Sequence, residues 1–260
     1  MTAGAGGLRL ALLGDPVAHS RSPAIHAAAL AAAGLVGSYE ARAVDAAGFA
    51  DALDDLLGGG LDGANVTMPH KRRAFAACSA VSADARQAGA VNTMGRAAGG
   101  VAGWNTDVDA LRVALASMPA APLLVLGAGA AAAAALVAAG DRQVRLAARR
   151  SAAAETLAGT VGAATAVPWG QGFVGSIVVN ATPLGMAGES LPPAALAGCA
   201  GLIDFAYGDH PTPAVVSVGG RGLPVVDGLE MLVSQAAASF TIWTGQPAPR
   251  EAMKRAARAG

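Results

Sequence analysis

The sequence predicts a two-domain α/β protein, and three observations lead to this fold class. The chain has 260 residues, about the length of two average domains. Its first half alternates short strand-like runs with alanine-rich helical runs. Its second half starts again with an apolar run that ends at a glycine-rich turn. Alternating strands and helices are typical of mainly parallel sheets, so we expect one such sheet in each half.

In the first half, strands and helices are expected to follow one another in turn. The expected strands are Leu8–Leu13, Tyr39–Val44 and Gly63–Thr67. The expected helices are Pro23–Ala33, Phe49–Leu57 and a segment that begins near Lys71. Pro23 suits the first position of a helix, where no backbone N–H is needed, and Ser22 has the side chain of an N-cap.

The second half begins with Pro122–Leu126, whose continuous apolar character indicates a strand buried on both faces. Further strands are expected at Gln143–Ala147, Ser176–Asn180, Leu202–Asp204 and Pro224–Val226. Helices are expected at Ala130–Ala139, Leu229–Trp243 and Pro249–Ala259. The domain boundary is expected near Asp107, in the turn that precedes another helix.

Composition excludes several classes of protein. Apolar residues make up 53% of the chain and charged residues 14%, against roughly 25% charged in an average globular protein, so the chain is not disordered. Lys plus Arg and Asp plus Glu are both 18, without the basic excess of a nucleic-acid-binding protein. Cys78 and Cys199 lie far apart and suggest neither a disulfide framework nor a metal site. We therefore expect a globular cytoplasmic protein without a nucleic-acid partner or a bound metal.

Two apolar segments have to be distinguished from export and membrane signals. Leu10–Leu13 is too short for the hydrophobic region of a signal peptide. Val113–Gly140 carries no charge and would be long enough to cross a bilayer. Prolines and glycines interrupt it, however, and its second half is mostly alanine. We expect no membrane span.

A dinucleotide-binding loop is predicted after Pro122–Leu126. The sequence Gly127-x-Gly129-x-x-Ala132 lies between a strand and a helix, as this fingerprint requires. The first glycine permits a tight turn, the second lets a pyrophosphate approach the backbone, and the helix N-terminus supplies amide donors. The alternative is an alanine-rich helix that only packs on the sheet, but its position after a strand favours the cofactor loop.

The end of the next strand indicates NADP rather than NAD. An NAD site usually places Asp or Glu there to bind the ribose 2′-hydroxyl. Here the sequence is Ala148-Arg149-Arg150-Ser151, without an acidic residue. Two guanidinium groups and a hydroxyl suit a 2′-phosphate. The alternative is a solvated arginine pair at a strand end.

Polar residues gather where the predicted strands end. They form the segments His19–Ser22, Asn65–Lys71, Ala90–Thr93 and Trp104–Asp107. Ligands of open α/β sheets bind outside the carboxyl ends of the strands. Hydroxyls, amides, one lysine and one aspartate suit a polyhydroxylated small molecule.

Each of these residues also has a structural alternative. The Ser22 hydroxyl would be fully used if it capped its helix, and Asp107 would have the same role for a helix beginning near Val108. Lys71 would be an ordinary solvated lysine. His19 and His70 are expected at the surface or in packing, because no metal-ligand spacing accompanies them.

Together these motifs closely resemble the shikimate dehydrogenase family. The matching stretches, in family order, are GDPVAHSRSP at 14–23, NVTMPHK at 65–71, GAVNT at 89–93, NTD at 105–107, NATPLGM at 180–186 and DGLEMLVSQ at 227–235. The resemblance extends from Leu10 to about Ala257. It implies NADPH-dependent reduction of 3-dehydroshikimate to shikimate in aromatic amino-acid biosynthesis.

The resemblance also implies roles for individual residues. Lys71 and Asp107 look like the catalytic pair. Ser20 and Ser22 would bind the substrate carboxylate with Tyr207 close to it, and the ring hydroxyls would be bound by Thr67, Asn92 and Gln235. For the cofactor, the residues implied are Gly127, Ala128, Gly129, Ala130 and Ala131 at the pyrophosphate, Arg149, Arg150 and Ser151 at the 2′-phosphate, and Thr182, Phe205, Gly228 and Met231 beside the nicotinamide.

The family fold implies a discontinuous first domain. Residues 1–107, completed by helices within 229–260, would form the substrate-binding domain, and residues 108–228 a Rossmann-like NADP-binding domain. Three departures from the family pattern bear mainly on cofactor preference and on how Tyr207 is held. Ala130 stands where the family commonly has glycine, Arg149-Arg150-Ser151 replaces Asn-Arg-Thr, and Asp209 replaces a proline after Tyr207.

Two other functions remain open from the sequence. One is a dehydrogenase of quinate or an aminoshikimate that also admits NAD. The other is a catalytically silent NADP-binding sensor, which the presence of both Lys71 and Asp107 disfavours. The expected partners are small molecules only, and the sequence leaves a monomer and a homodimer equally open.

Overall fold

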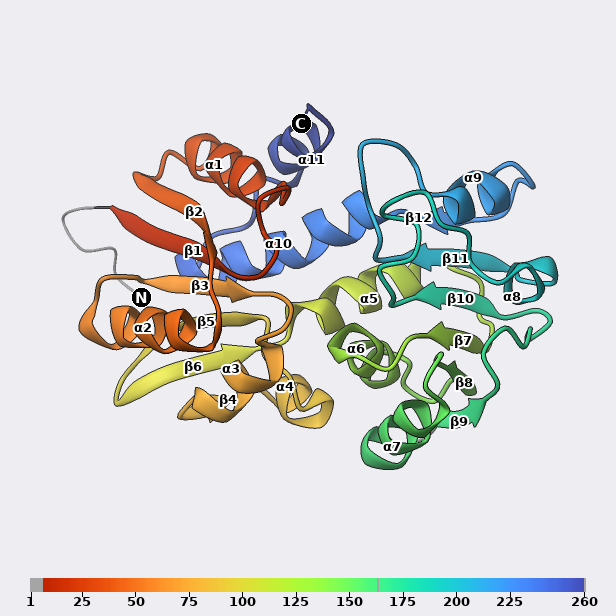
Figure 1. The fold of residues 1–260 in the computed structure, drawn as a ribbon. Helices are drawn as coiled ribbons and strands as arrows, with labels where there is room; N and C mark the ends of the chain where they lie inside the picture. The colour runs from red at the N-terminus through yellow and green to blue at the C-terminus, as the bar shows by residue number, and fades with distance from the viewer. Residues whose placement is uncertain (1–6, 163, 260) are drawn as a thin grey trace. The chain divides into compact units, whose positions relative to one another are not determined.

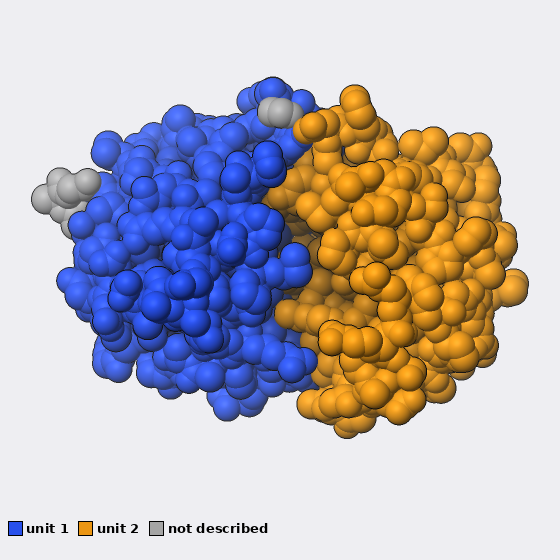
Figure 2. All heavy atoms as spheres, in the orientation of Figure 1, with its two compact units in different colours: residues 1–106, 233–260 blue, residues 107–232 orange. Residues whose placement is uncertain are grey.

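The chain is divided into two compact units in a computed structural model that describes residues 7–162 and 164–259 (Figure 1). Unit 1 consists of Met1–Thr106 and Val233–Gly260, and unit 2 of Asp107–Leu232 (Figure 2). The chain crosses from unit 1 to unit 2 between Thr106 and Asp107, at the start of α5 (Thr106–Ala116) and next to the boundary expected near Asp107. It returns to unit 1 between Leu232 and Val233, inside α10 (Gly228–Thr244).

Unit 1 contains a six-stranded sheet in the order β2-β1-β3-β5-β6-β4. Its strands are β1 (Leu8–Gly14), β2 (Gly37–Ala43), β3 (Gly63–Val66), β4 (Ala80–Val81), β5 (Thr93–Ala97) and β6 (Gly100–Trp104). Its helices, besides most of α10, are α1 (Ser22–Ala32), α2 (Ala46–Gly58), α3 (Lys71–Ala77), α4 (Ala83–Ala88) and α11 (Arg250–Ala259). β1 runs parallel to β2 and β3, whereas β5 runs antiparallel to β3 and β6. The β5–β6 hairpin, which the sequence analysis did not predict, introduces two antiparallel pairings, so the sheet is less uniformly parallel than expected.

The predicted N-cap of α1 is wrong, and so is the alternative in which Asp107 caps its helix. The N-cap of α1 is Arg21, which makes no side-chain cap hydrogen bond, and Ser22 is the first helical residue. α5 begins at Thr106, so Asp107 lies in its first turn rather than at its cap. Neither Ser22 nor Asp107 thus has the purely structural role that a cap would give it.

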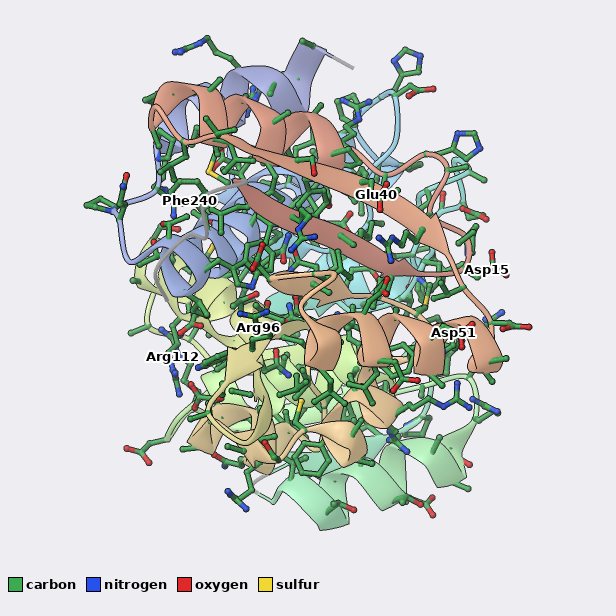
Figure 3. The ribbon with its side chains drawn as sticks, turned by 90° about the vertical axis from the view of Figure 1, so that its left-hand side faces the viewer. Asp15, Glu40, Asp51, Arg96, Arg112 and Phe240 are labelled. Carbon is green, nitrogen blue, oxygen red and sulfur yellow. The ribbon has the colours of Figure 1, made fainter. Side chains whose placement is uncertain are left out.

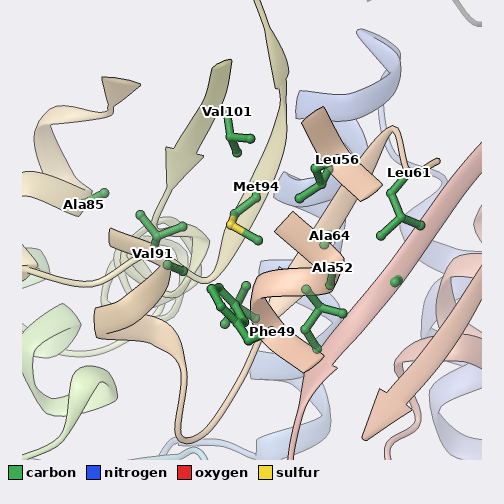
Figure 4. Close-up of a cluster of buried hydrophobic side chains, with 13 residues drawn as sticks. Phe49, Ala52, Leu56, Leu61, Ala64, Ala85, Val91, Met94 and Val101 are labelled. Atoms are coloured by element: carbon green, nitrogen blue, oxygen red, sulfur yellow. The ribbon is translucent and has the colours of Figure 1, made fainter. Parts of the chain in front are cut away.

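The core of unit 1 lies between the sheet and α2, α3 and α4 (Figure 4). Phe49 and Leu56 of α2 pack there with Leu13 of β1 and Met94 of β5, all at most 1% exposed. Burying one such side chain contributes about 1.5–3 kcal/mol. On the other face of the sheet α10 packs directly on β3, since a Cβ at Gly63 would lie 2.3 Å from Trp243 Nε1.

Strand β2 forms an exposed edge of this sheet and carries charges. Glu40, labelled in Figure 3, accepts a bond from Arg42 Nε at 2.6 Å, and Arg42 also pairs with Asp55 of α2 at 2.8 Å. Charged side chains of this kind discourage pairing of an edge strand with another chain.

Unit 2 contains a six-stranded, wholly parallel sheet in the order β12-β11-β10-β7-β8-β9. Its strands are β7 (Leu123–Leu126), β8 (Val144–Ala147), β9 (Ala164–Val167), β10 (Ile177–Asn180), β11 (Gly201–Asp204) and β12 (Val225–Val226). Its helices, besides α5 and the start of α10, are α6 (Ala130–Ala138), α7 (Ser151–Val161), α8 (Pro193–Ala197) and α9 (Pro213–Gly219). This is the Rossmann strand order, which reverses between β7 and β10.

The uncharged segment Val113–Gly140 is divided between α5, β7 and α6. Among the described residues, no helix combines the length and the apolar character that crossing a bilayer requires.

Candidate functional site

The polar segments of unit 1 meet at one end of its sheet, where several of its strands terminate. β1, β3 and β6 end there, and β5, which runs the opposite way, begins there, with Thr93 paired to Asn65 and to Trp104. Ser20 and Thr67 lie in the loops after β1 and β3, Ser22 and Lys71 open the helices that follow these loops, and Asn92 directly precedes β5. The expectation that these residues gather at strand ends is met, although Asn92 lies at an amino end.

Gly14 lets the loops after β1 and β3 approach each other closely. A Cβ at Gly14 would lie 2.3 Å from Thr67 Cγ2 and 2.7 Å from the carbonyl oxygen of Met68. Two backbone bonds join these loops, Asp15 N to Met68 O and Thr67 N to Leu13 O, both at 2.9 Å. The segment with Thr67 is therefore fixed beside the start of the loop that leads to Ser20 and Ser22.

The two serines differ in their surroundings. Ser20 is half-buried and its Oγ accepts a hydrogen bond from Ser22 N at 3.2 Å. Ser22 is only 4% exposed.

Lys71 is the first residue of α3, and its backbone is tied to the segment of Asn92. Val91 N donates to Lys71 O at 3.0 Å, and Asn92 N donates to Trp104 O at the same distance. The Asn92 side chain is 2% exposed, and its Oδ1 accepts from Thr106 N at 2.7 Å. Gln235 lies on α10, half-buried, in the same unit.

The two histidines of these loops have the places expected for packing or surface residues. His19 is exposed. His70 is 2% exposed, its Nε2 donates to Val44 O at 2.8 Å, and its Nδ1 accepts from Arg73 at 3.0 Å. Within the described ranges, no group of three or more His, Cys, Asp or Glu side chains could hold a metal ion.

In unit 2, the glycine loop follows β7 at the switch point of the sheet. Gly127 has φ of +119°, and a Cβ there would lie 2.7 Å from the carbonyl oxygen of Ala181, after β10. Both the backbone conformation and the close approach of these two loops therefore require glycine. Ala128 is half-buried in the same turn.

Gly129 and the start of α6 leave space and donors for an anion. An added Cβ at Gly129 would meet no atom within 4 Å. The first backbone bond of the helix runs from Ala133 N to Gly129 O at 3.0 Å, and no side chain caps it. The N–H groups of Ala130, Ala131 and Ala132 consequently have no partner inside the helix. The dinucleotide pyrophosphate fits this arrangement.

Arg149 and Arg150 lie between β8 and α7, and both are exposed. Within the described residues, neither forms an ion pair. Ser151 opens α7, whose backbone bonding starts with Ala153 N to Arg150 O at 3.0 Å. Two cationic side chains beside unpaired helix donors suit a phosphate group.

The loop after β10 is held by a buried carboxylate. Asp204 is 0% exposed and accepts from Asn180 Nδ2, Ala206 N and the Thr212 hydroxyl at 2.7–2.9 Å. Burial raises the pKa of Asp204, against the effect of these hydrogen bonds. The Thr182 hydroxyl donates to Asn180 Oδ1 at 2.6 Å and accepts from Leu184 N at 3.2 Å, so its proton is already used within the loop.

The remaining candidates lie near the end of β11 and the start of α10. Phe205 and Tyr207 are half-buried, and Met231 is 2% exposed. Gly228 packs against this segment, since a Cβ there would lie 2.3 Å from Ala206 O. Asp107 and Tyr207 belong to unit 2, whereas the other substrate candidates and Lys71 belong to unit 1.

Sequence reasoning missed the buried groups that support these sites. Tyr39 and Ser239 form hydrogen bonds around Asn92 or its neighbours, and Asp204 holds the loop after β10. The only signal was the rarity of polar residues within otherwise apolar stretches, which does not reveal their partners.

The fold and the two sites define a class of protein: oxidoreductases in which a nicotinamide dinucleotide binds a Rossmann unit and the substrate a second α/β unit. The family model described as the shikimate dehydrogenase substrate binding domain matches residues 12–94, and that of the shikimate 5′-dehydrogenase C-terminal domain matches residues 228–258. The chain belongs to the shikimate dehydrogenase family.

Relatives that span nearly the whole chain support this assignment. A shikimate dehydrogenase (NADP(+)) of Anaeromyxobacter sp. (strain Fw109-5) is 41% identical, over 94% of this chain and 94% of its own. That of Acidiphilium cryptum (strain JF-5) is 40% identical, over 98% and 97%. The solved shikimate 5-dehydrogenase from Thermus thermophilus, in complex with NADP(H) and shikimate, superimposes with a TM-score of 0.88 at 37% identity, over 97% of this chain and 99% of its own.

Proposed function

We propose that this protein is an NADP-dependent shikimate dehydrogenase that reversibly reduces 3-dehydroshikimate to shikimate. The observation that carries the proposal is the group of polar residues at one end of the unit 1 sheet. There Val91 N donates a backbone hydrogen bond to Lys71 O, which joins the proposed proton donor to the segment of Asn92, a proposed substrate-binding residue. Membership of the shikimate dehydrogenase family indicates which substrate these residues would bind.

The cofactor groups of unit 2 fit NADP. The open space at Gly129 and the donors of α6 would hold the pyrophosphate, with Gly127, Ala128, Ala130 and Ala131 around it. Arg149, Arg150 and Ser151 would bind the 2′-phosphate, which NAD lacks. Thr182, Phe205, Gly228 and Met231 would line the nicotinamide. Bound NADPH supplies the hydride that reduces the ketone carbon.

Reduction of the ketone also needs a proton at its oxygen. Lys71 Nζ–H donates this proton as negative charge develops on the oxygen, and in the reverse direction the amine accepts it from the hydroxyl. Asp107 is the second member of the proposed catalytic pair, on the strength of the family resemblance.

The remaining polar side chains bind and orient the substrate. Hydroxyls of Ser20 and Ser22 would donate to its carboxylate. The ring hydroxyls would be bound by Thr67, Asn92 and Gln235. Fixing the ketone in one orientation supplies much of the rate, because the reacting atoms no longer have to find each other.

The test is oxidation of shikimate and of quinate with NADP⁺ and with NAD⁺, followed at the absorbance of the reduced nicotinamide. Turnover of shikimate with NADP⁺ alone is the expected result. Turnover of quinate, or with NAD⁺, would instead assign the broader dehydrogenase activity. Tight NADP⁺ binding without turnover of either substrate would favour an aminoshikimate dehydrogenase or a sensor.

The location and the assembly belong to the same proposal. A role in aromatic amino-acid biosynthesis supports a cytoplasmic protein, as the composition does. Its ligands would be small molecules, and we propose a monomer or a homodimer. Size-exclusion chromatography with light scattering distinguishes the two.

A further inference from the structure

A buried cluster of hydroxyl and amide groups in unit 1 contacts the Asn92 side chain. Its members, called the hydroxyl–amide cluster below, are Tyr39, Asn65, Thr93, Thr106 and Ser239. They come from β2, β3, β5, α5 and α10, and their exposed fractions lie between 0% and 9%. Among the described residues, none of their side-chain polar atoms is buried without a partner.

The two ends of the cluster fix the direction of its hydrogen bonds. At one end Asn65 Nδ2 donates to the carbonyl oxygen of Asn92 at 3.2 Å, and since a carbonyl only accepts, Asn65 Oδ1 is the atom that accepts from the Tyr39 hydroxyl at 2.8 Å. At the other end a backbone N–H, that of Thr106, lies 2.7 Å from the Asn92 side chain. Because a backbone N–H can only donate, the Asn92 atom facing it must be the oxygen Oδ1.

Asn92 Oδ1 is thus committed to the cluster. Besides Thr106 N it accepts from the hydroxyls of Thr106 and Thr93, both at 3.2 Å. The remaining group of the side chain is Nδ2–H₂, which only donates. An oxygen of a substrate that contacts Asn92 therefore has to act as an acceptor, as a ketone oxygen or a hydroxyl oxygen does.

The Ser239 hydroxyl joins this cluster to α10. It lies 2.9 Å from Asn65 Nδ2, 2.9 Å from Thr93 Oγ1 and 3.2 Å from Thr106 Oγ1. It also donates to the carbonyl oxygen of Gln235, one helical turn earlier, at 3.0 Å. One buried hydroxyl thus contacts both the groups that hold Asn92 and the backbone of Gln235.

From this geometry we infer that Ser239 is a positioning residue for substrate binding: it holds Asn92 as an obligatory donor and keeps the Gln235 turn of α10 in register with it. The inference rests on the proposed function, in which Asn92 and Gln235 contact the substrate. Alanine at 239 removes an acceptor from Asn65 Nδ2 and leaves the hydroxyls of Thr93 and Thr106 without the neighbouring oxygen that lies 2.9 Å and 3.2 Å from them. Buried polar groups do not tolerate this loss, so the cluster and Asn92 rearrange.

The test compares Ser239→Ala with Thr241→Ala in the full-length protein. Thr241 is a matched control, because it is exposed on the same helix and its hydroxyl also bonds the carbonyl four residues earlier, Ala237 O at 3.1 Å. We expect Ser239→Ala to raise KM for shikimate about 3- to 10-fold, the effect of about one misplaced hydrogen bond. The dissociation constant of NADP⁺ should not change, and Thr241→Ala should have the wild-type KM.

A second pair separates hydrogen bonding from packing at Thr93. Thr93→Val keeps the shape of the side chain without its hydroxyl, and Thr93→Ser keeps the hydroxyl without the methyl group. The inference requires the larger rise in KM for Thr93→Val. Two outcomes would show that Ser239 is only a structural residue. One is an equal KM for shikimate in Thr93→Val and Thr93→Ser. The other is a Ser239→Ala protein with a lower kcat and melting temperature but an unchanged KM for shikimate.

Crystal structures of the wild type and of Ser239→Ala make the result independent of turnover. Rotation or disorder of the Asn92 carboxamide in the variant supports the positioning role. An Asn92 carboxamide unchanged in the variant overturns the inference even if shikimate is the substrate. An inactive wild type with a rearranged Asn92 in the variant overturns the proposed function, while the positioning of Asn92 by Ser239 stands.

Discussion

Lys71 is one of only two lysines in the chain, and the other, Lys254, lies on α11. This makes a clean comparison possible for the proposed proton transfer. We expect Lys71→Met to lower kcat by about 10²- to 10⁴-fold, because the alkoxide would lose its proton donor. NADP⁺ affinity, measured by fluorescence titration, should remain that of the wild type. Lys254→Met is the control, and a Lys71→Met enzyme as active as this control would contradict the role.

The arginine pair can be tested by its effect on cofactor choice. Replacing both Arg149 and Arg150 with Ala removes the cations proposed to hold the 2′-phosphate. We expect KM for NADP⁺ to rise about 10-fold or more, since hydrogen bonds to charged groups are the strong ones, while KM for NAD⁺ changes little. Arg145→Ala is the control, because Arg145 instead lies over the Phe173 ring at 3.9 Å. Equal changes for both cofactors would place the phosphate elsewhere.

His26 makes unit 1 sensitive to acid. Its ring is 0% exposed, stacks on Tyr39 at 4.2 Å between centroids, and has no hydrogen-bond partner among the described residues. Burial lowers its pKa from 6.5 to about 3. Between these two values the unfolded state binds a proton that the folded state does not, so stability falls as the pH decreases.

The predicted cost of His26 is about 2 kcal/mol between pH 7 and pH 5. His26→Phe retains an aromatic ring against Tyr39 and removes the titrating group. We expect urea unfolding, followed by the fluorescence of the nearby Trp243, to show about that much less loss of stability at pH 5 in His26→Phe than in the wild type. His210→Gln, at an exposed histidine, should behave like the wild type. Parallel losses in all three proteins would exclude His26 as the source.

The two glycines of the loop after β7 have different roles: Gly127 is needed for the fold, and Gly129 leaves space for the cofactor. Gly127 has a positive φ and no room for a Cβ, so Gly127→Ala should destabilise unit 2 by about 1–3 kcal/mol. Gly129 has an ordinary φ of −96° and open space beside it, so Gly129→Ala should fold normally. Its methyl group would nevertheless occupy the place proposed for the pyrophosphate. Thermal melting and NADP⁺ titration of both variants test this, and wild-type NADP⁺ affinity in Gly129→Ala would argue against the cradle.

The strand Leu123–Leu126 was predictable because it is buried on both faces, which makes it a continuous apolar run. The β5–β6 hairpin escaped prediction because Thr93–Ala97 and Gly100–Trp104 are rich in small residues that favour no secondary structure. Its turn is marked only by Gly99 and Gly100, both with positive φ.

The candidate ligand-binding residues could be proposed from the sequence because they lie in motifs at strand ends, whereas the buried partners of Ser239 could not. Ser239 bonds Asn65, 174 residues away in the sequence, and Thr93, 146 residues away. A serine inside an amphipathic helix carries no local sign of such partners. Contacts of this range follow only from the packing of α10 against β3 and β5, which periodicity does not determine.

At the level of the whole chain, each proposed ligand belongs to a different unit. The cofactor groups at 127–132 and 149–151 lie in unit 2, and most of the substrate groups, at 20–22, 67–71, 92 and 235, lie in unit 1. The helix donors of Ala130–Ala132 have no intrahelical partner, so their amide hydrogens should exchange rapidly until a phosphate accepts them.

This separation predicts distinct protection by each ligand in millisecond hydrogen exchange followed by mass spectrometry. NADP⁺ alone should slow exchange in peptides covering 127–132 and 149–152, because bound phosphates accept bonds from these amides. Shikimate alone should slow exchange around 20–23, 65–71 and 90–93, because a ligand that binds only the folded state suppresses local opening of the loops it contacts. A quinate control, at the same concentration, shows whether protection of unit 1 requires shikimate itself. If NADP⁺ protected only the unit 1 segments, or if shikimate left them unprotected, the assignment of one ligand to each unit would be wrong.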